Sequence, residues 1–256
     1  MKLTRLFAML FVLVFALTIS VGIAYPQGDS TPEPTEEPTE EPEEEVEEWV
    51  PYCTEENRDE IAAEDYYIPL ISKGFQHQFW QAVKLGAEQA AEACGVTITF
   101  EGPESESQVD KQIEMLQTAL DKNPDAIGFA ALDSRAAIPL LERAQEEGIP
   151  VIAFDSGVDS DIPLTTAATD NVAAAALAAD MMAELIGFEG EVAVIAHDQT
   201  SRTGIDRVTG FKERIEEAYP DIEIVDIQYG GGDHLRSTDL AKAIILAHPN
   251  LKGFFG

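Results

Sequence analysis

The residues best suited to chemistry stand just after short apolar runs, which is where an open parallel sheet places its ligand. They include acids, amides, hydroxyls, histidines and aromatic rings. Such groups suit a polyol, because carboxylates pair with hydroxyls and rings pack on apolar C–H faces. The segments concerned are residues 72–80, 132–134, 155–157, 169–171, 197–202 and 230–234.

Three aromatic residues in the first of these segments are candidate ligand contacts. Phe79 shares a helical face with Val83 and Ala87, so it could belong to the core as readily as to a binding site. Trp80 lies one residue off that face, and we therefore expect its indole ring to point toward a ligand. Phe75 stands in a loop, where it could bind or fill a gap.

Three aspartates follow apolar runs, and each could either bind a hydroxyl or cap the next helix. For Asp133 both roles fit equally well. Asp155 precedes Ser-Gly and a long loop rather than a helix, which favours ligand contact. Asp170 directly precedes a helical pattern, so capping alone could account for it.

Metal, phosphate and catalytic sites are not expected. The spacing of His77, His197 and His234 matches no known metal site, and we expect no cofactor. The glycines at 230–232 weakly suggest a phosphate site, but Asp233 beside them would repel the anion. The sequence lacks the G-x-S-x-G, P-loop and H-E-x-x-H motifs. A secreted hydrolase would need a nucleophile–base pair or two paired acids in the cleft, and Asp133 with Asp155 could in principle form such a pair.

Apolar runs and helical patterns alternate through the chain and predict an α/β fold. Such alternation implies parallel sheets flanked by helices and joined by right-handed crossovers. The pattern restarts after Asp170, which predicts a first lobe over 65–168 and a second over 169–256. The second lobe would hold only three strands, so we expect it to be incomplete. The predicted strands lie at 67–71, 96–100, 126–131, 150–154, 164–168, 191–196, 222–229 and 251–255.

The first 64 residues differ in composition from the rest. Residues 1–24 join a short basic head to an apolar run and predict a signal peptide, although an uncleaved anchor fits as well. Either form places the remainder outside the cytoplasm, in the periplasm or at the cell surface. Residues 25–64 are predicted to form a linker. Its Pro/Glu-rich part, 25–48, has too few apolar groups to fold.

The chain is strongly acidic, with 48 Asp and Glu against 16 Lys and Arg and a net charge of −32. Outside residues 1–48 it still carries 37 acids and 14 bases, a net charge of −23. Such a surface repels phosphate backbones, so we expect no nucleic-acid partner.

Cys53 and Cys94 are the two cysteines of the chain. They could pair in an oxidising compartment or remain as two thiols. Each lies just before a predicted strand. Neighbouring parallel strands begin at the same edge of a sheet, so a bridge there would join the linker to the first lobe, away from the ligand.

Four stretches together resemble the ribose-binding-protein-like family of type I periplasmic binding proteins. They are QFWQAVKLGAEQAA, AALDSRAAIPLLERAQEEGIPVIAFDS, TTAATDNVAAAALAADMM and RTGIDRVTGF. The resemblance spans about residues 66–256 and implies a two-lobed fold that captures a monosaccharide or similar polyol for the membrane permease of an ABC-type importer.

The resemblance also implies roles for particular residues. Phe79 and Trp80 match paired aromatics that pack on a sugar ring, and Lys73 and His77 match polar positions of the same loop. The remaining matches are Asp155 and Ser156 as contacts to ring hydroxyls, Asp170 and Asn171 as the first crossover between the lobes, and Arg207, with Arg202 nearby, as a cleft arginine.

Rival interpretations share this fold. A sugar-sensing repressor would need an N-terminal helix-turn-helix and no export signal, the reverse of this chain. An extracytoplasmic sensor that presents its ligand to a chemoreceptor or kinase would use the same pocket, so only its partner separates it from an importer subunit.

Overall fold

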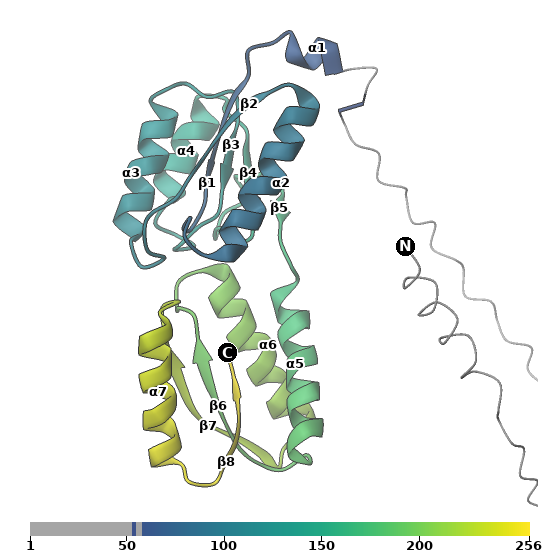
Figure 1. Cartoon of the computed structure of the whole chain (residues 1–256), viewed down its shortest axis with the longest axis vertical. Helices are drawn as coiled ribbons and strands as arrows, with labels where there is room; N and C mark the ends of the chain where they lie inside the picture. Colours follow the sequence, from purple (N-terminus) through teal and green to yellow (C-terminus); the bar gives the residue numbers. More distant parts are fainter. Residues whose placement is uncertain (1–52, 55–57) are drawn as a thin grey trace, which may run out of the picture. The chain divides into compact units, whose positions relative to one another are not determined.

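The computed structural model describes Cys53, Thr54 and residues 58–256. The segment Val50–Gly256 forms one compact unit, and the described part contains two parallel sheets, each with helices on both faces (Figure 1). The predicted signal peptide and Pro/Glu-rich tail lie outside the described residues. The expected α/β fold of two lobes built on parallel sheets is confirmed.

The first lobe contains five strands in the spatial order β2-β1-β3-β4-β5, all parallel. Helix α2 covers one face of this sheet, and α3 and α4 cover the other (Figure 1). The elements are β1 (Tyr67–Ile71), α2 (Gln78–Cys94), β2 (Thr97–Glu101), α3 (Val109–Leu120), β3 (Ile127–Phe129), α4 (Ile138–Glu146), β4 (Val151–Phe154) and β5 (Thr166–Ala167).

The core of the first lobe lies between the sheet and helices α3 and α4. All three residues of β3 are buried, as expected for a central parallel strand covered on both faces. Phe129 of this strand belongs to a cluster with Leu116 and Leu120 of α3 and Leu141 of α4, all of them almost fully buried. This packing fixes the strands whose carboxyl ends carry the candidate site.

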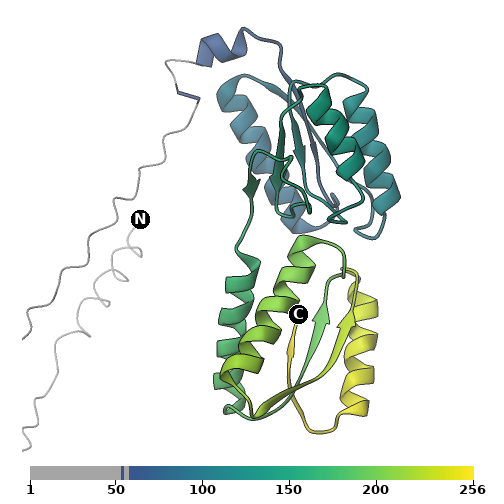
Figure 2. The same ribbon diagram turned by 180° about the vertical axis from the view of Figure 1, so that it is seen from behind.

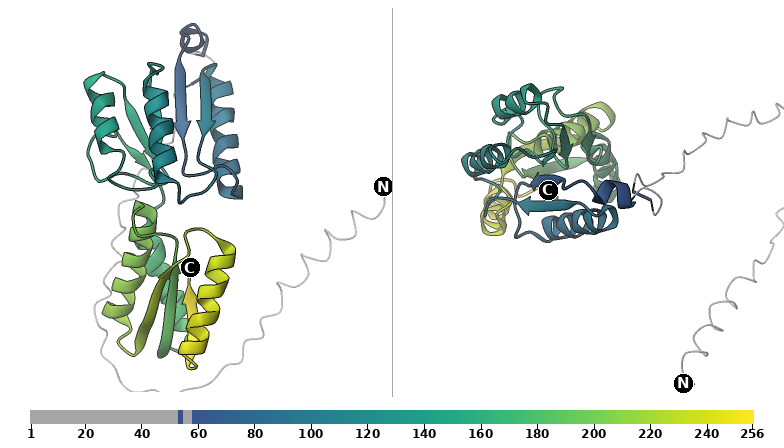
Figure 3. Two further views of the ribbon diagram at one scale, coloured as in Figure 1. Left: turned by 90° about the vertical axis from the view of Figure 1, so that its left-hand side faces the viewer. Right: turned by 90° about the horizontal axis from the view of Figure 1, so that it is seen from above.

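The second lobe contains three parallel strands in the order β7-β6-β8. Helices α5 and α6 lie against one face, and α7, drawn in yellow, lies on the opposite face (Figures 2 and 3). The elements are α5 (Asn171–Ile186), β6 (Gly190–Ala196), α6 (Arg202–Ala218), β7 (Ile222–Tyr229), α7 (His234–Ala247) and β8 (Leu251–Phe255). Phe211 and Ile215 of α6 pack with the alanines of α5 in the core.

The chain passes from the first lobe to the second between β5 and α5. Asp170 caps α5, because its side chain accepts a hydrogen bond from the backbone N–H of Ala173. The side-chain amide of Asn171 donates to the carbonyl of Thr169 across the same junction. Both residues predicted for the crossover therefore order the start of α5.

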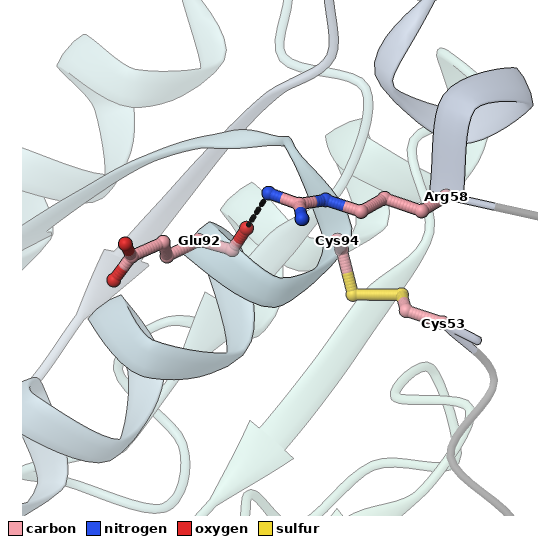
Figure 4. The surroundings of a disulfide bond; sticks show 4 residues. All are labelled: Cys53, Arg58, Glu92 and Cys94. Carbon is pink, nitrogen blue, oxygen red and sulfur yellow. Dashed lines mark hydrogen bonds between the residues drawn. A yellow bond between two sulfur atoms is a disulfide. The ribbon is translucent and has the colours of Figure 1, made fainter. Parts of the chain in front are cut away.

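A short helix, α1 (Arg58–Ala62), occupies part of the segment 25–64 that was expected to be an unstructured linker. A disulfide joins Cys53 of this segment to Cys94, and their Cα atoms are 5.2 Å apart. Arg58 Nη2 also donates to the carbonyl of Glu92, 3.0 Å away (Figure 4). Of the two alternatives left open by the sequence, the structure shows the paired one, and the disulfide holds Cys53 against the end of α2.

Within the residues that the structure describes, no helix is both long enough and apolar enough to span a membrane.

Candidate functional site

A cleft of about 860 Å³ opens at the carboxyl ends of the strands. Segments that follow β1, β2 and β4 in the first lobe, and β6 and β7 in the second, contribute to its walls. This is where ligands bind in open α/β sheets, and the volume lies in the usual range of small-molecule sites. The structure brings seven predicted site residues to this cleft: Lys73, Phe75, His77, Phe79, Trp80, Asp155 and Arg207.

The floor of the cleft is held in place by a buried glutamine of α3. Gln112 is 1% exposed and donates through Nε2 to the carbonyls of Ser72 and Ala130, which follow β1 and β3. Its Oε1 accepts from the backbone N–H of Leu132. A single side chain thus satisfies backbone groups of two neighbouring strand ends and fixes the loop that begins with Lys73.

Lys73 is the central cation of the cleft, although it is only 5% exposed. Its Nζ donates to Thr203 Oγ1 at 3.0 Å, and it lies 3.5 Å from Asp155 Oδ2 and 3.9 Å from Glu106 Oε2. A buried ammonium requires partners of this kind, because an unpaired charge inside a protein is costly. Thr203 belongs to α6, so Lys73 also joins the two lobes.

Asp155 presents a partly buried carboxylate to the cleft. Its φ of 57° lies in the left-handed region, which is rare for residues other than glycine. Burial raises the pKa of Asp155, while Lys73 and Arg207 act in the opposite direction. Among the described residues nothing donates a hydrogen bond to Asp155 Oδ1, so this oxygen can accept one from a ligand. Ser156, next in sequence, is fully buried and does not line the cleft.

Glu106 is the second carboxylate near Lys73, and it was not among the site residues predicted from the sequence. Its Oε1 accepts from Trp80 Nε1 at 2.7 Å, and its Oε2 lies 3.0 Å from His197 Nε2. Burial by itself would raise the pKa of Glu106, but His197, Trp80 and Lys73 outweigh burial and lower the pKa to about 2. Glu106 is therefore ionised at neutral pH.

The two neighbouring aromatics have the reverse of the predicted exposures. Trp80 is 2% exposed and belongs to the buried face of α2 with Ala91, whereas Phe79 is 46% exposed. The expectation that Trp80 lies off the core face was wrong, because the buried stripe starts one position later than the alanine pattern indicated. Trp80 still reaches the cleft wall, and the Phe79 ring packs edge-on against it, with centroids 4.9 Å apart.

Two predicted residues, His77 and Asp133, accept hydrogen bonds from nearby backbone N–H groups. His77 caps α2 through Nδ1, which accepts from the backbone N–H of Phe79, and it also lines the cleft. Asp133 lies outside the cleft, and its Oδ1 accepts from the N–H groups of Arg135 and Ala136. These bonds order the turn before α4, whose N-cap is Ala137, so a local turn rather than a helix cap accounts for Asp133.

Of the two candidate arginines, Arg207 lines the cleft and Arg202 does not. Arg207 Nε donates to Asn171 Oδ1 at 2.9 Å, which connects the predicted crossover to the cleft wall. Arg202 instead pairs with Asp206 on its own helix and with Asp159 of the first lobe.

No group of three or more His, Cys, Asp or Glu side chains within the described ranges is arranged to hold a metal ion.

A family model described as a periplasmic binding protein domain matches residues 68–256. The chain belongs to this family. The predicted resemblance to ribose-binding-protein-like sugar-binding proteins is confirmed by curated relatives. The chain is 29% identical over 202 residues to the D-allose-binding periplasmic protein of Escherichia coli K12, covering 76% of this chain and 64% of that protein. It is 26% identical over 193 residues to the D-ribose/D-allose-binding protein of Pseudomonas aeruginosa, covering 72% and 60%.

Solved structures of periplasmic binding proteins show the same fold. An ABC transporter solute-binding protein from Agrobacterium vitis with bound D-fucose has a TM-score of 0.71 and 34% identity, covering 74% of this chain and 67% of that one. A carbohydrate transporter solute-binding protein from Agrobacterium radiobacter in complex with D-arabinose has a TM-score of 0.72 and 29% identity, covering 75% and 66%. The chain thus spans about two thirds of its relatives.

Sequence reasoning missed several residues that line the cleft of this periplasmic binding protein. Glu104, Ser105 and Glu106 follow β2, a strand whose carboxyl end was left out when the candidate segments were chosen. Applying the strand-end rule to every strand would have found them. Leu235 and Ser237 lie in the first turn of α7, beyond the segment 230–234 that was considered.

Proposed function

We propose that this chain captures a monosaccharide or similar polyol outside the cytoplasm and delivers it to the permease of an ABC-type importer. The observation that carries the proposal is the Asp155 carboxylate, which is partly buried in the cleft and whose Oδ1 accepts no hydrogen bond from the residues that the structure describes. A sugar hydroxyl supplies such a donor, and the exposed ring of Phe79 supplies an apolar surface for C–H groups in the same cleft.

Membership of the periplasmic binding protein family supports this function, as do the names of its relatives. Those proteins bind sugars rather than transform them, and we propose the same for this chain. The basic and apolar start of the sequence supports export, either by a cleaved signal or with a membrane anchor. The net charge of −32 argues against a nucleic-acid partner.

The test is a thermal-shift screen of the whole exported chain against pentoses, hexoses, inositols and amino acids. We expect at least one sugar or polyol to raise the melting temperature, because a ligand that binds only the folded state stabilises it. A response to amino acids alone would contradict the proposal.

Asp155→Asn should then weaken binding of the responding ligand by about tenfold to a hundredfold, the usual value of a hydrogen bond to a charged group. The matched control is Asp161→Asn, an exposed aspartate of the connection between β4 and β5. Calorimetric titration of both variants measures the effect. Equal affinities for the two variants would show that Asp155 does not contact the ligand.

A further inference from the structure

Glu106 and His197 approach each other across the two lobes of the cleft. Glu106 follows β2 in the first lobe, and His197 follows β6 in the second. Glu106 Oε2 and His197 Nε2 are 3.0 Å apart, and the two side chains are only 19% and 24% exposed. At this distance an imidazole N–H can donate a hydrogen bond to a carboxylate, and such a bond to a charged acceptor is stronger than one between neutral groups.

Glu106 is firmly attached to its own lobe. Its Oε1 is fixed by the indole N–H of Trp80, which is itself part of the core, and its Oε2 lies near the ammonium of Lys73. These partners leave Glu106 Oε2 directed at the second lobe. The contacts with Trp80 and Lys73 therefore hold the negative charge of Glu106 at one place in the cleft.

His197 is equally well placed in the second lobe. The next residue, Asp198, accepts hydrogen bonds from the N–H groups of Thr200 and Ser201 and so fixes the start of α6. His197 Nε2 is buried and has no aligned hydrogen bond, although it lies within ion-pair distance of Glu106. At 3.0 Å from Glu106 Oε2, His197 Nε2 lies within hydrogen-bonding distance of the carboxylate.

The space around the imidazole ring depends on a glycine after β7. Gly232 has a φ of 72°, and a Cβ atom built there would lie 2.7 Å from His197 Cε1. A side chain at this position would therefore require the imidazole ring to shift from its place beside Glu106. The absence of one leaves His197 room to reach the first lobe.

We propose that Glu106 and His197 form a latch that holds the two lobes together before a ligand binds. The pair acts beside other contacts between the lobes: Lys73 with Thr203, and the N–H of Ser134 with the carbonyl of Thr200. Ligand binding then starts from a partly closed cleft, which reduces the ordering that binding must impose. This proposal does not depend on which ligand binds.

The test measures the distance between the lobes in the ligand-free chain. Spin labels on Glu142→Cys of α4 and Glu213→Cys of α6, both exposed sites, report this distance by pulsed electron resonance. The native cysteines are paired in the disulfide, so only the introduced thiols react. The latch is broken by Glu106→Gln, which keeps an acceptor for Trp80, or from the other lobe by His197→Ala.

We expect each change to lower the population of the short distance at least about threefold, the low end of coupling between contacting groups. The double variant should show no further decrease. Glu104→Gln and His234→Ala, which alter the same cleft outside the pair, should match the parent, and melting curves confirm folding. The proposal is overturned if either latch variant matches the parent, if the two effects add, or if the control variants open the lobes equally.

Discussion

At the scale of single residues, the adjacent Phe79 and Trp80 divide two tasks that sequence patterns cannot separate. Trp80 packs in the core and holds Glu106, and Phe79 exposes its ring to the cleft. The division follows from the direction of each side chain on α2, because consecutive helical positions point about 100° apart.

Substitution should separate these tasks. Trp80→Ala should lower the free energy of unfolding by about 3–5 kcal/mol, as for other buried aromatics. Phe79→Ala should weaken ligand binding by about tenfold and leave the melting temperature within a few degrees of the parent. Calorimetric titration and melting curves measure both effects. Leu85→Ala, an exposed residue on the same helix, is the control. If Phe79→Ala destabilised the fold as much as Trp80→Ala, its ring would belong to the core.

Glu106 should leave a signature in the acid stability of the protein. Its pKa of about 2 in the folded state lies below the ordinary value of 4.5. The ionised carboxylate therefore stabilises the fold above about pH 4.5, and this contribution is lost as the pH falls through 2. Asp155, with its raised pKa, acts in the opposite direction.

Denaturant unfolding of the parent and Glu106→Gln at pH 6 and near pH 2 measures this contribution. The stability gap between them should be up to about 3 kcal/mol at pH 6 and should shrink toward pH 2. Glu104→Gln, which alters an exposed carboxyl of the same loop, is the matched control. If the difference in free energy of unfolding stayed constant with pH, the partners of Glu106 would not stabilise its ionised form.

At the scale of elements, the alternation of strands and helices was enough to predict both sheets. Short apolar runs such as 127–129, bounded by turns, are typical of central strands that are covered on both faces of a parallel sheet. The face of α2 was predicted one residue out of place, because its many alanines give weak contrast between buried and exposed positions. Glu106 could have been found from the end of β2. Its contact with His197 could not, because that contact depends on how two lobes meet.

Helix α1 lies in a segment predicted to be a linker, close to the disulfide between Cys53 and Cys94. The disulfide closes a loop over a sequence separation of 41 residues, which limits the conformations of the unfolded chain. Cys94 stands before β2, at the edge of the sheet away from the cleft. The disulfide should therefore stabilise the folded chain without changing its affinity for the ligand.

Replacing Cys53 and Cys94 together by Ser should lower the free energy of unfolding by about 2–4 kcal/mol and leave ligand affinity unchanged. In the exported parent protein, thiol labelling under denaturing and non-reducing conditions should detect no free cysteine. Two labelled thiols would contradict the pairing, and a loss of affinity in the double variant would connect this edge of the lobe to binding.

At the scale of the whole molecule, the first 48 residues are distinguished from the rest by composition alone. They contain 11 of the 48 acids but few apolar groups beyond the first 24 positions. We interpret residues 25–48 as a spacer between the export signal or anchor and the binding lobes.

Deleting residues 25–48 should change ligand affinity by less than about threefold, or roughly 0.6 kcal/mol. Replacing them with a neutral Gly/Ser segment of equal length should give the same result, since neither the charge nor the sequence of a spacer contributes to the cleft. Titration of both forms with the ligand found by thermal shift measures this. A larger change in either form would assign the acidic tail a part in recognition.

The hydrogen bond between Trp80 and Glu106 also allows ligand binding to be followed by tryptophan fluorescence. The chain has two tryptophans, so Trp49→Phe leaves a single emitter whose indole N–H is held by a carboxylate at the wall of the cleft. The emission of an indole shifts with the electric field around its ring, and a ligand that displaces water near Lys73 and Glu106 changes that field. Binding kinetics can then be followed in stopped-flow experiments without any attached dye.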